Sequence, residues 1–148
     1  MDLMKRKRFV IAVLVSVIMI FCLSGCESSA RVSIEDYQWE VTTIQDNDSG
    51  YVAACSDGYT DLFPDAAEID ISCTAGNGEL TLTNRTDNQT YSGTYVKESS
   101  EPESIIYRIS ICEEDGTAVC AWTVYSDGST TPTLIFSVGG YTLNFEGA

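Results

Sequence analysis

Histidine is absent from this chain of 148 residues. Its absence removes the most frequent general base of enzymes and the most frequent ligand of protein-bound metals. The sequence also lacks a Cys-x-x-Cys pair, a G-x-S-x-G or S-x-x-K motif and a phosphate-binding glycine loop. We therefore expect a protein that is not an enzyme and that holds no metal and no cofactor.

Basic residues are scarce, with eight Lys and Arg against 22 Asp and Glu. Four of the eight lie at positions 5 to 8, so residues after 25 keep four basic residues against 21 acidic ones, a net charge of −17. Such a surface repels phosphate backbones and anionic lipid headgroups alike. Nucleic acid is therefore excluded as a partner.

The first 25 residues have the three parts of an export signal. Basic residues at positions 5 to 8 precede an uncharged apolar run from Phe9 to Phe21, and small residues follow. The run is shorter than the roughly 20 residues that a membrane-spanning helix needs. A cleaved signal is therefore favoured over a transmembrane anchor.

The signal ends in Leu23-Ser24-Gly25-Cys26, which resembles the lipobox of bacterial lipoproteins. The resemblance implies cleavage before Cys26 and acyl chains, palmitate among them, on that residue. It also implies a protein anchored to the cell membrane by lipid on its extracytoplasmic face. The expected divisions are a signal peptide over 1–25, a lipidated cysteine and tether over 26–35, and one folded domain over 36–148. An ordinary secretory signal with an incidental cysteine is the alternative.

Beyond residue 35 apolar and polar residues alternate with the period of two that is typical of β-strands, and turn dipeptides separate the segments. This pattern predicts eight strands, at residues 36–45, 68–75, 78–85, 89–97, 104–112, 117–125, 132–138 and 141–146.

Three turn dipeptides predict the strand register. A two-residue turn at Asn77-Gly78 places Cys73 opposite Leu82, and one at Gly139-Gly140 places Phe136 opposite Leu143. A turn at Asp115-Gly116 would place Tyr107 opposite Val124 and Ile111 opposite Cys120. In all three hairpins the large apolar side chains then share one face.

Successive hairpins with one apolar face favour a sheet that closes on itself. The predicted fold is all-β, an eight-stranded antiparallel up-and-down meander barrel, whose interior is filled by side chains or holds one small ligand. The long connection 46–67, with an expected helical turn near 64–67, is a candidate lid or pocket rim.

The domain is similar to the lipocalin-like (calycin) barrels of bacterial lipoproteins. The similarity lies in a tryptophan early in the first strand (Trp39), the hairpin GNGELTLT at 76–83, the strand YSGTY at 91–95 and the closing meander. Tyr37 stands where these domains have a glycine. The resemblance implies that Trp39 closes one end of the barrel and that the barrel binds a ligand.

Inward-facing aromatic and aliphatic side chains are the candidate ligand-binding residues. They are Trp39, Tyr95, Tyr107, Trp122, Phe136 and Leu143. Lining a pocket for a small apolar or amphipathic molecule is one interpretation. Core packing is the other, and it would make the protein an interaction or scaffold module that contacts another envelope protein.

Four cysteines remain as disulfide candidates, because a pairing is expected in an oxidising compartment. They are Cys55, Cys73, Cys112 and Cys120, and Cys55 with Cys73 is the pair we expect first. The oxygen-rich segment 46–50 has the look of a calcium loop, but its glycine lies one position early for an EF-hand. A solvated turn is therefore expected there.

Overall fold

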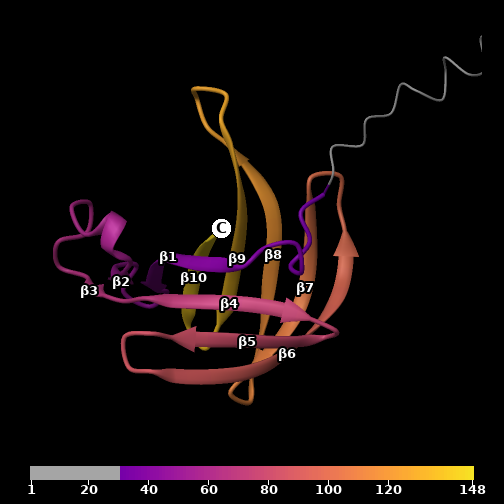
Figure 1. Ribbon diagram of the computed structural model, residues 1–148, viewed down its shortest axis with the longest axis horizontal. Helices are drawn as coiled ribbons and strands as arrows, with labels where there is room; N and C mark the ends of the chain where they lie inside the picture. Colours follow the sequence, from indigo (N-terminus) through magenta and orange to yellow (C-terminus); the bar gives the residue numbers. More distant parts are fainter. Residues whose placement is uncertain (1–30) are drawn as a thin grey trace, which may run out of the picture. The chain divides into compact units, whose positions relative to one another are not determined.

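The computed structural model describes residues 31–148, in which ten β-strands form one continuous sheet (Figure 1). The predicted signal peptide over 1–25 and the predicted lipidation site Cys26 lie outside the described residues. The strands are β1 (Trp39–Asp46), β2 (Val52–Cys55), β3 (Ala67–Glu68), β4 (Ile71–Gly76), β5 (Glu79–Asn84), β6 (Gln89–Ser100), β7 (Ser104–Ile111), β8 (Glu114–Val124), β9 (Thr130–Val138) and β10 (Tyr141–Gly147). Within 31–148 no helix is long and apolar enough to cross a membrane.

Eight of the strands close into an antiparallel up-and-down barrel. Each strand from β4 to β10 pairs with the next, and β1 closes the circle by pairing with β10 along its whole length and with β4 at Trp39 and Glu40. Figure 1 shows β4 and β5 running crosswise to the strands from β7 to β10. The predicted fold class and all eight predicted strands are confirmed. Strands β2 and β3 were not predicted.

Two of the three predicted turns are confirmed. Asn77 and Gly78 have φ of 53° and 81°, and Gly139 and Gly140 have φ of 59° and 79°. Two successive positive φ angles define the type I′ turn, whose twist matches that of the flanking strands. The register follows as predicted, with Cys73 opposite Leu82 and Phe136 opposite Leu143.

The third predicted turn is wrong, because the β7–β8 hairpin turns at Cys112-Glu113 (φ 53° and 65°) instead of Asp115-Gly116. Tyr107 consequently lies opposite Ala118, six positions before the predicted Val124. A shift by an even number keeps every side chain on its expected face.

Gly116 explains this difference. It lies inside β8, where a Cβ atom would come within 2.3 Å of the Ser137 carbonyl oxygen on β9. Gly116 therefore allows β8 and β9 to lie close together, and it does not form the hairpin turn.

Large side chains fill the barrel. Trp39, Leu134 and Phe136 have no exposed surface, which means that no void large enough for water touches them. The fully buried core also includes Ile34, Leu80, Tyr107, Ile109 and Phe145. The centre of the barrel is thus packed as densely as an ordinary protein core.

The segment before β1 closes one end of the barrel. Val32 and Ile34 are buried, and the Ile34 carbonyl accepts a hydrogen bond of 2.8 Å from the Trp39 indole. The Tyr107 hydroxyl lies 3.1 Å from Ser33 Oγ and accepts from the Ile34 amide at 3.3 Å. The core therefore begins at Val32, inside the stretch expected to be tether.

Candidate functional site

The barrel has two different ends. The N-terminal end carries the segment 31–38 and the turns 77–78, 101–103 and 125–129. The far end carries the other turns and the long β1–β4 connection, residues 47–70. A ring of partly buried apolar side chains lines the far end. These side chains are Ile44, Ile69, Tyr91, Ile111, Val138 and Leu143.

The six predicted ligand-binding residues do not gather in one cavity. Trp39, Tyr107 and Phe136 are at most 2% exposed and Tyr95 is 8% exposed, so these four are core residues. Trp122 is 38% exposed and lies two residues before the end of β8, towards the N-terminal end of the barrel. Leu143 lies in the ring at the far end.

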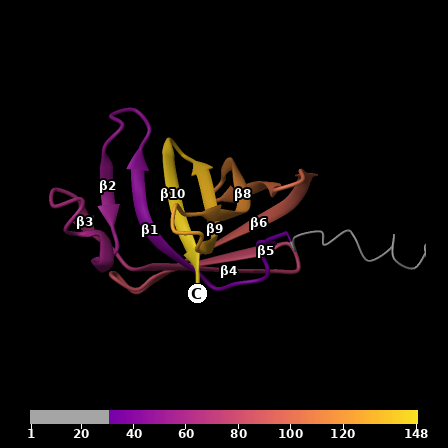
Figure 2. The ribbon, with the colours of Figure 1, turned by 90° about the horizontal axis from the view of Figure 1, so that it is seen from above.

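The β1–β4 connection folds over the outside of the sheet and is anchored there. Strand β2 pairs with the second half of β1, and β3 pairs with β2 in parallel, which extends the sheet beyond the barrel (Figure 2). The Tyr59 hydroxyl donates a 3.0 Å hydrogen bond to Glu146 on β10. Burial and the neighbouring Glu146 carboxylate raise the pKa of Tyr59 to about 12.

The helical turn lies earlier in this connection than predicted. The 3₁₀ helix η1 spans Asp57–Tyr59, and the Thr60 hydroxyl bonds the Asp57 carbonyl at 2.9 Å. Near the expected position 64–67 the chain forms a single hydrogen-bonded turn, in which the Ala66 amide donates to the Phe63 carbonyl at 3.0 Å, and not a helix. The turn ends there because Ala67 pairs with Ala54 as part of β3.

This connection forms an apolar hollow of about 450 Å³. Tyr51 and Leu62 are 78% and 70% exposed there, so the hollow presents two large apolar side chains to water. The lining residues are Tyr51, Val52, Leu62, Phe63, Pro64, Asp65 and Ala66. This hollow lies within the connection itself and has no lining residue from the barrel interior, so whether the connection acts as a lid or rim of a barrel pocket stays a prediction. Strand alternation does not indicate which residues of the connection form it.

The surroundings of the hollow are acidic. Residues 46–68 contain six Asp and Glu and no Lys or Arg. Arg85 is engaged elsewhere, since its Nη2 lies 2.5 Å from both Glu40 and Asp70 across the β1–β4 seam. Hydrogen bonds from this guanidinium hold the pKa of Asp70 below its usual value.

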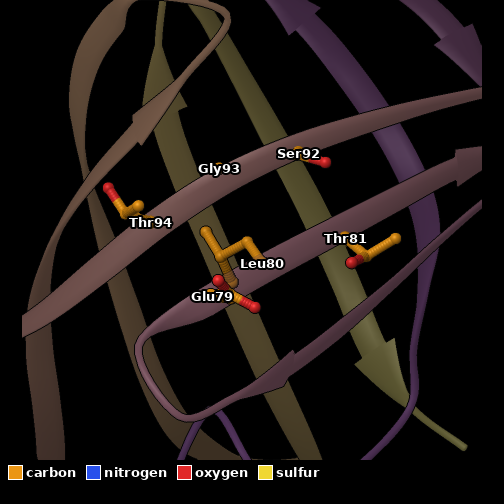
Figure 3. A pocket seen from close by; sticks show the side chains of 6 residues that line it. All are labelled: Glu79, Leu80, Thr81, Ser92, Gly93 and Thr94. Atoms are coloured by element: carbon orange, nitrogen blue, oxygen red, sulfur yellow. The ribbon is translucent and has the colours of Figure 1, made fainter.

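A second hollow, of about 310 Å³, lies on the β5–β6 strands (Figure 3). Figure 3 shows the hydroxyls of Thr81, Ser92 and Thr94 spread along the two strands and not converging on one point. Glu79 is the single charged side chain in its lining. This arrangement offers no acid and base pair for catalysis.

The oxygen-rich segment 46–50 is a turn, as expected. The Asp46 carboxylate accepts hydrogen bonds from the amides of Asp48 and Ser49, at 2.8 and 3.3 Å. In the part of the chain that the structure describes, no three His, Cys, Asp or Glu side chains come together to bind a metal ion.

The predicted Cys55–Cys73 disulfide is absent, and the four cysteines in residues 31–148 are free thiols. Cys55 lies opposite Thr43 on β1 and Cys73 lies opposite Trp39. Four residues along a strand separate the two positions by about 13 Å, and a disulfide requires Cα atoms within about 7 Å.

Burial makes the core thiols unreactive. It raises the pKa of Cys73 and of Cys120 to about 12, whereas Cys112 lies exposed in the β7–β8 turn. We expect a maleimide at pH 8 to modify Cys112 in the native protein, and Cys55, Cys73 and Cys120 only after unfolding. Peptide mapping by mass spectrometry checks this, and modification of Cys73 at the rate of Cys112 would contradict the described core.

Comparisons with known proteins identify no relative, because no protein-family model, no curated protein and no solved structure matches the chain.

Proposed function

We propose that this protein is a lipid-anchored module of the bacterial cell envelope that captures a basic peptide segment carrying a large apolar side chain. The lipid anchor is at Cys26, and the capture site is the hollow of the β1–β4 connection. The observation that carries the proposal is an exposed apolar lining within a segment, residues 46–68, that has six carboxylates and no Lys or Arg.

The apolar lining of the hollow supports binding of a large apolar side chain from the partner. Tyr51 and Leu62 keep most of their surface in water, so covering them releases free energy on binding. A hollow of about 450 Å³ accommodates one large apolar side chain with its neighbours. Tyrosine is also enriched among the residues that dominate protein interfaces.

The negative charge of residues 46–68 supports a partner rich in Lys and Arg. The six carboxylates of residues 46–68 attract Lys and Arg on either side of the apolar side chain, which speeds association and rejects acidic segments. The partner is either a segment of an envelope protein or a free cationic peptide, since both present the same chemistry.

Binding to the full-length chain in phosphatidylcholine nanodiscs tests the proposal. The probe is a fluorescent hexapeptide with two central leucines and two lysines on each side. We expect it to bind, whereas the same peptide with glutamates for lysines, or with serines for leucines, does not. Leu62→Ser should weaken binding roughly 30-fold, because a buried leucine contributes about 2 kcal/mol.

Val96→Ser is the matched control, since Val96 is 61% exposed on β6, outside the hollow. Equal loss of binding in both variants, or equal binding of the three peptides, would contradict the proposed site. If the free peptide binds, a second measurement uses a folded protein that displays the same basic segment. Binding of that protein supports a segment of an envelope protein as the partner, and binding of the free peptide alone supports a free cationic peptide.

A small apolar molecule at the far end of the barrel is the second candidate, and the ring of partly buried side chains there favours it. The filled centre confines such a ligand to the mouth. The fluorescence of N-phenylnaphthylamine should then rise with the protein and fall in Leu143→Asp. No increase with the wild-type protein would rule out this candidate.

A further inference from the structure

The β8–β9 hairpin carries apolar side chains beyond the N-terminal end of the barrel. Trp122, Val124 and Tyr125, here named the hairpin tip, are 38%, 70% and 44% exposed. The turn is held by hydrogen bonds from the Tyr125 amide to the Ser129 carbonyl, at 2.9 Å, and from the Gly128 amide to the Tyr125 carbonyl, at 3.0 Å. The tip is therefore a defined structure and not a loose loop.

Aromatic contacts connect the hairpin tip to the core. The Trp122 ring meets Tyr37 edge-on with 6.4 Å between centroids, and Tyr37 meets the buried Trp39 at 5.5 Å. Tyr37 and Pro132 also pack so closely over Gly147 that a Cβ there would lie 2.8 Å from each. The position of the tip is thus fixed relative to the barrel.

The hairpin differs from the rest of the domain in charge. Among residues 116–145 the only charged residue is Asp127, although residues after 25 carry a net charge of −17. The Asp127 carboxylate accepts hydrogen bonds from the Ser129 amide and hydroxyl, at 2.9 and 2.6 Å. A nearly uncharged element that exposes Trp122, Val124 and Tyr125 beside a polar turn at 126–129 is suited to the interfacial layer of a bilayer.

The chain enters the barrel at the same end. Arg31 donates a 3.1 Å hydrogen bond to Ser100, the last residue of β6, beside the β6–β7 turn. Figure 1 shows the β8–β9 hairpin projecting beyond that turn in the same direction. Arg31 is five positions after Cys26, and five residue steps span at most about 18 Å. A lipid on Cys26 keeps this end close to the bilayer.

We propose that the hairpin tip inserts into the headgroup layer of the membrane that holds the Cys26 lipid. The inference rests on the lipid anchor of the proposed function. With the tip in the interface, the hollow of the β1–β4 connection lies at the opposite end of the barrel and faces the medium.

Tryptophan emission of the full-length protein in proteoliposomes tests the inference, because Trp39 and Trp122 are the only tryptophans of the chain. The probe is phosphatidylcholine brominated on the upper part of the acyl chain. We expect a roughly twofold loss of the Trp122 emission relative to unbrominated vesicles, since an indole at the interface lies within reach of these bromines. Trp122→Phe gives the background from Trp39, which is buried.

Val124→Asp should abolish the quenching, because it places a charge on the tip at a site exposed enough to tolerate it. Val96→Asp on β6 should leave the quenching unchanged. Absence of quenching in a protein whose Cys26 peptide is acylated by mass spectrometry overturns the inference and leaves the anchor intact. An unacylated Cys26 overturns both the anchor and the inference.

Discussion

Replacing Trp39 by alanine is expected to lower the free energy of unfolding by about 3–5 kcal/mol. The indole has no exposed surface, contacts Tyr37, and donates to the Ile34 carbonyl. The change therefore leaves a cavity and also removes the bond that holds the segment before β1. Since a domain of this size is stable by about 5–15 kcal/mol, the melting temperature should fall by roughly 10–20 °C.

Trp39→Phe separates the two contributions. Phenylalanine fills much of the cavity but leaves the buried Ile34 carbonyl without its donor, which costs about 1–3 kcal/mol. We expect urea unfolding to rank the proteins as wild type, Trp39→Phe and Trp39→Ala in falling order of stability. An alanine variant as stable as the wild type would show that Trp39 does not close the barrel.

The fold was predictable because strand alternation and two strong turn dipeptides agree with each other. A hairpin with Asn77-Gly78 or Gly139-Gly140 at its turn has one register that places its apolar residues on a common face. The eight strands and the closure of the barrel follow from these local signals. Strands β2 and β3 were missed because they are short and join the sheet through the irregular β1–β4 connection.

The candidate site was predictable only as a region. The alternation of side chains along a strand predicts that Trp122 and Phe136 point to the same face of the sheet. It does not predict how far each residue lies from the end of the barrel. Phe136 is fully buried, whereas Trp122 lies near the rim and is 38% exposed. The hollow depends on how residues 51 and 62–66 fold back on one another, and no periodic signal in the sequence reports such a loop conformation.

The wrong β7–β8 turn has an instructive cause. Asp-Gly is a strong hairpin dipeptide, but Gly116 is also the residue that lets β8 approach β9, and the two roles require different registers. Cys112 and Glu113 take up the positive φ angles, although neither is favoured there. Packing between neighbouring strands therefore prevails over the local preference of the turn.

Gly116→Ala tests this explanation and is expected to destabilise the protein by about 1–3 kcal/mol or more. The added methyl group would lie 2.3 Å from the Ser137 carbonyl oxygen and 2.8 Å from Val138 Cβ. Both neighbours belong to a paired strand, so relieving the clash requires β8 and β9 to separate. Chemical denaturation followed by circular dichroism measures the loss.

Gly76→Ala is the matched control, because a Cβ atom at Gly76 meets nothing within 4 Å. Gly76 ends β4 beside the Asn77-Gly78 turn, and alanine there should be neutral or stabilising by up to about 1 kcal/mol through the entropy of the unfolded chain. If Gly116→Ala is as mild as Gly76→Ala, the close approach of β8 and β9 does not set the register. The position of the β7–β8 turn must then come from the side chains of β7, whose Tyr107 and Ile109 are fixed in the core.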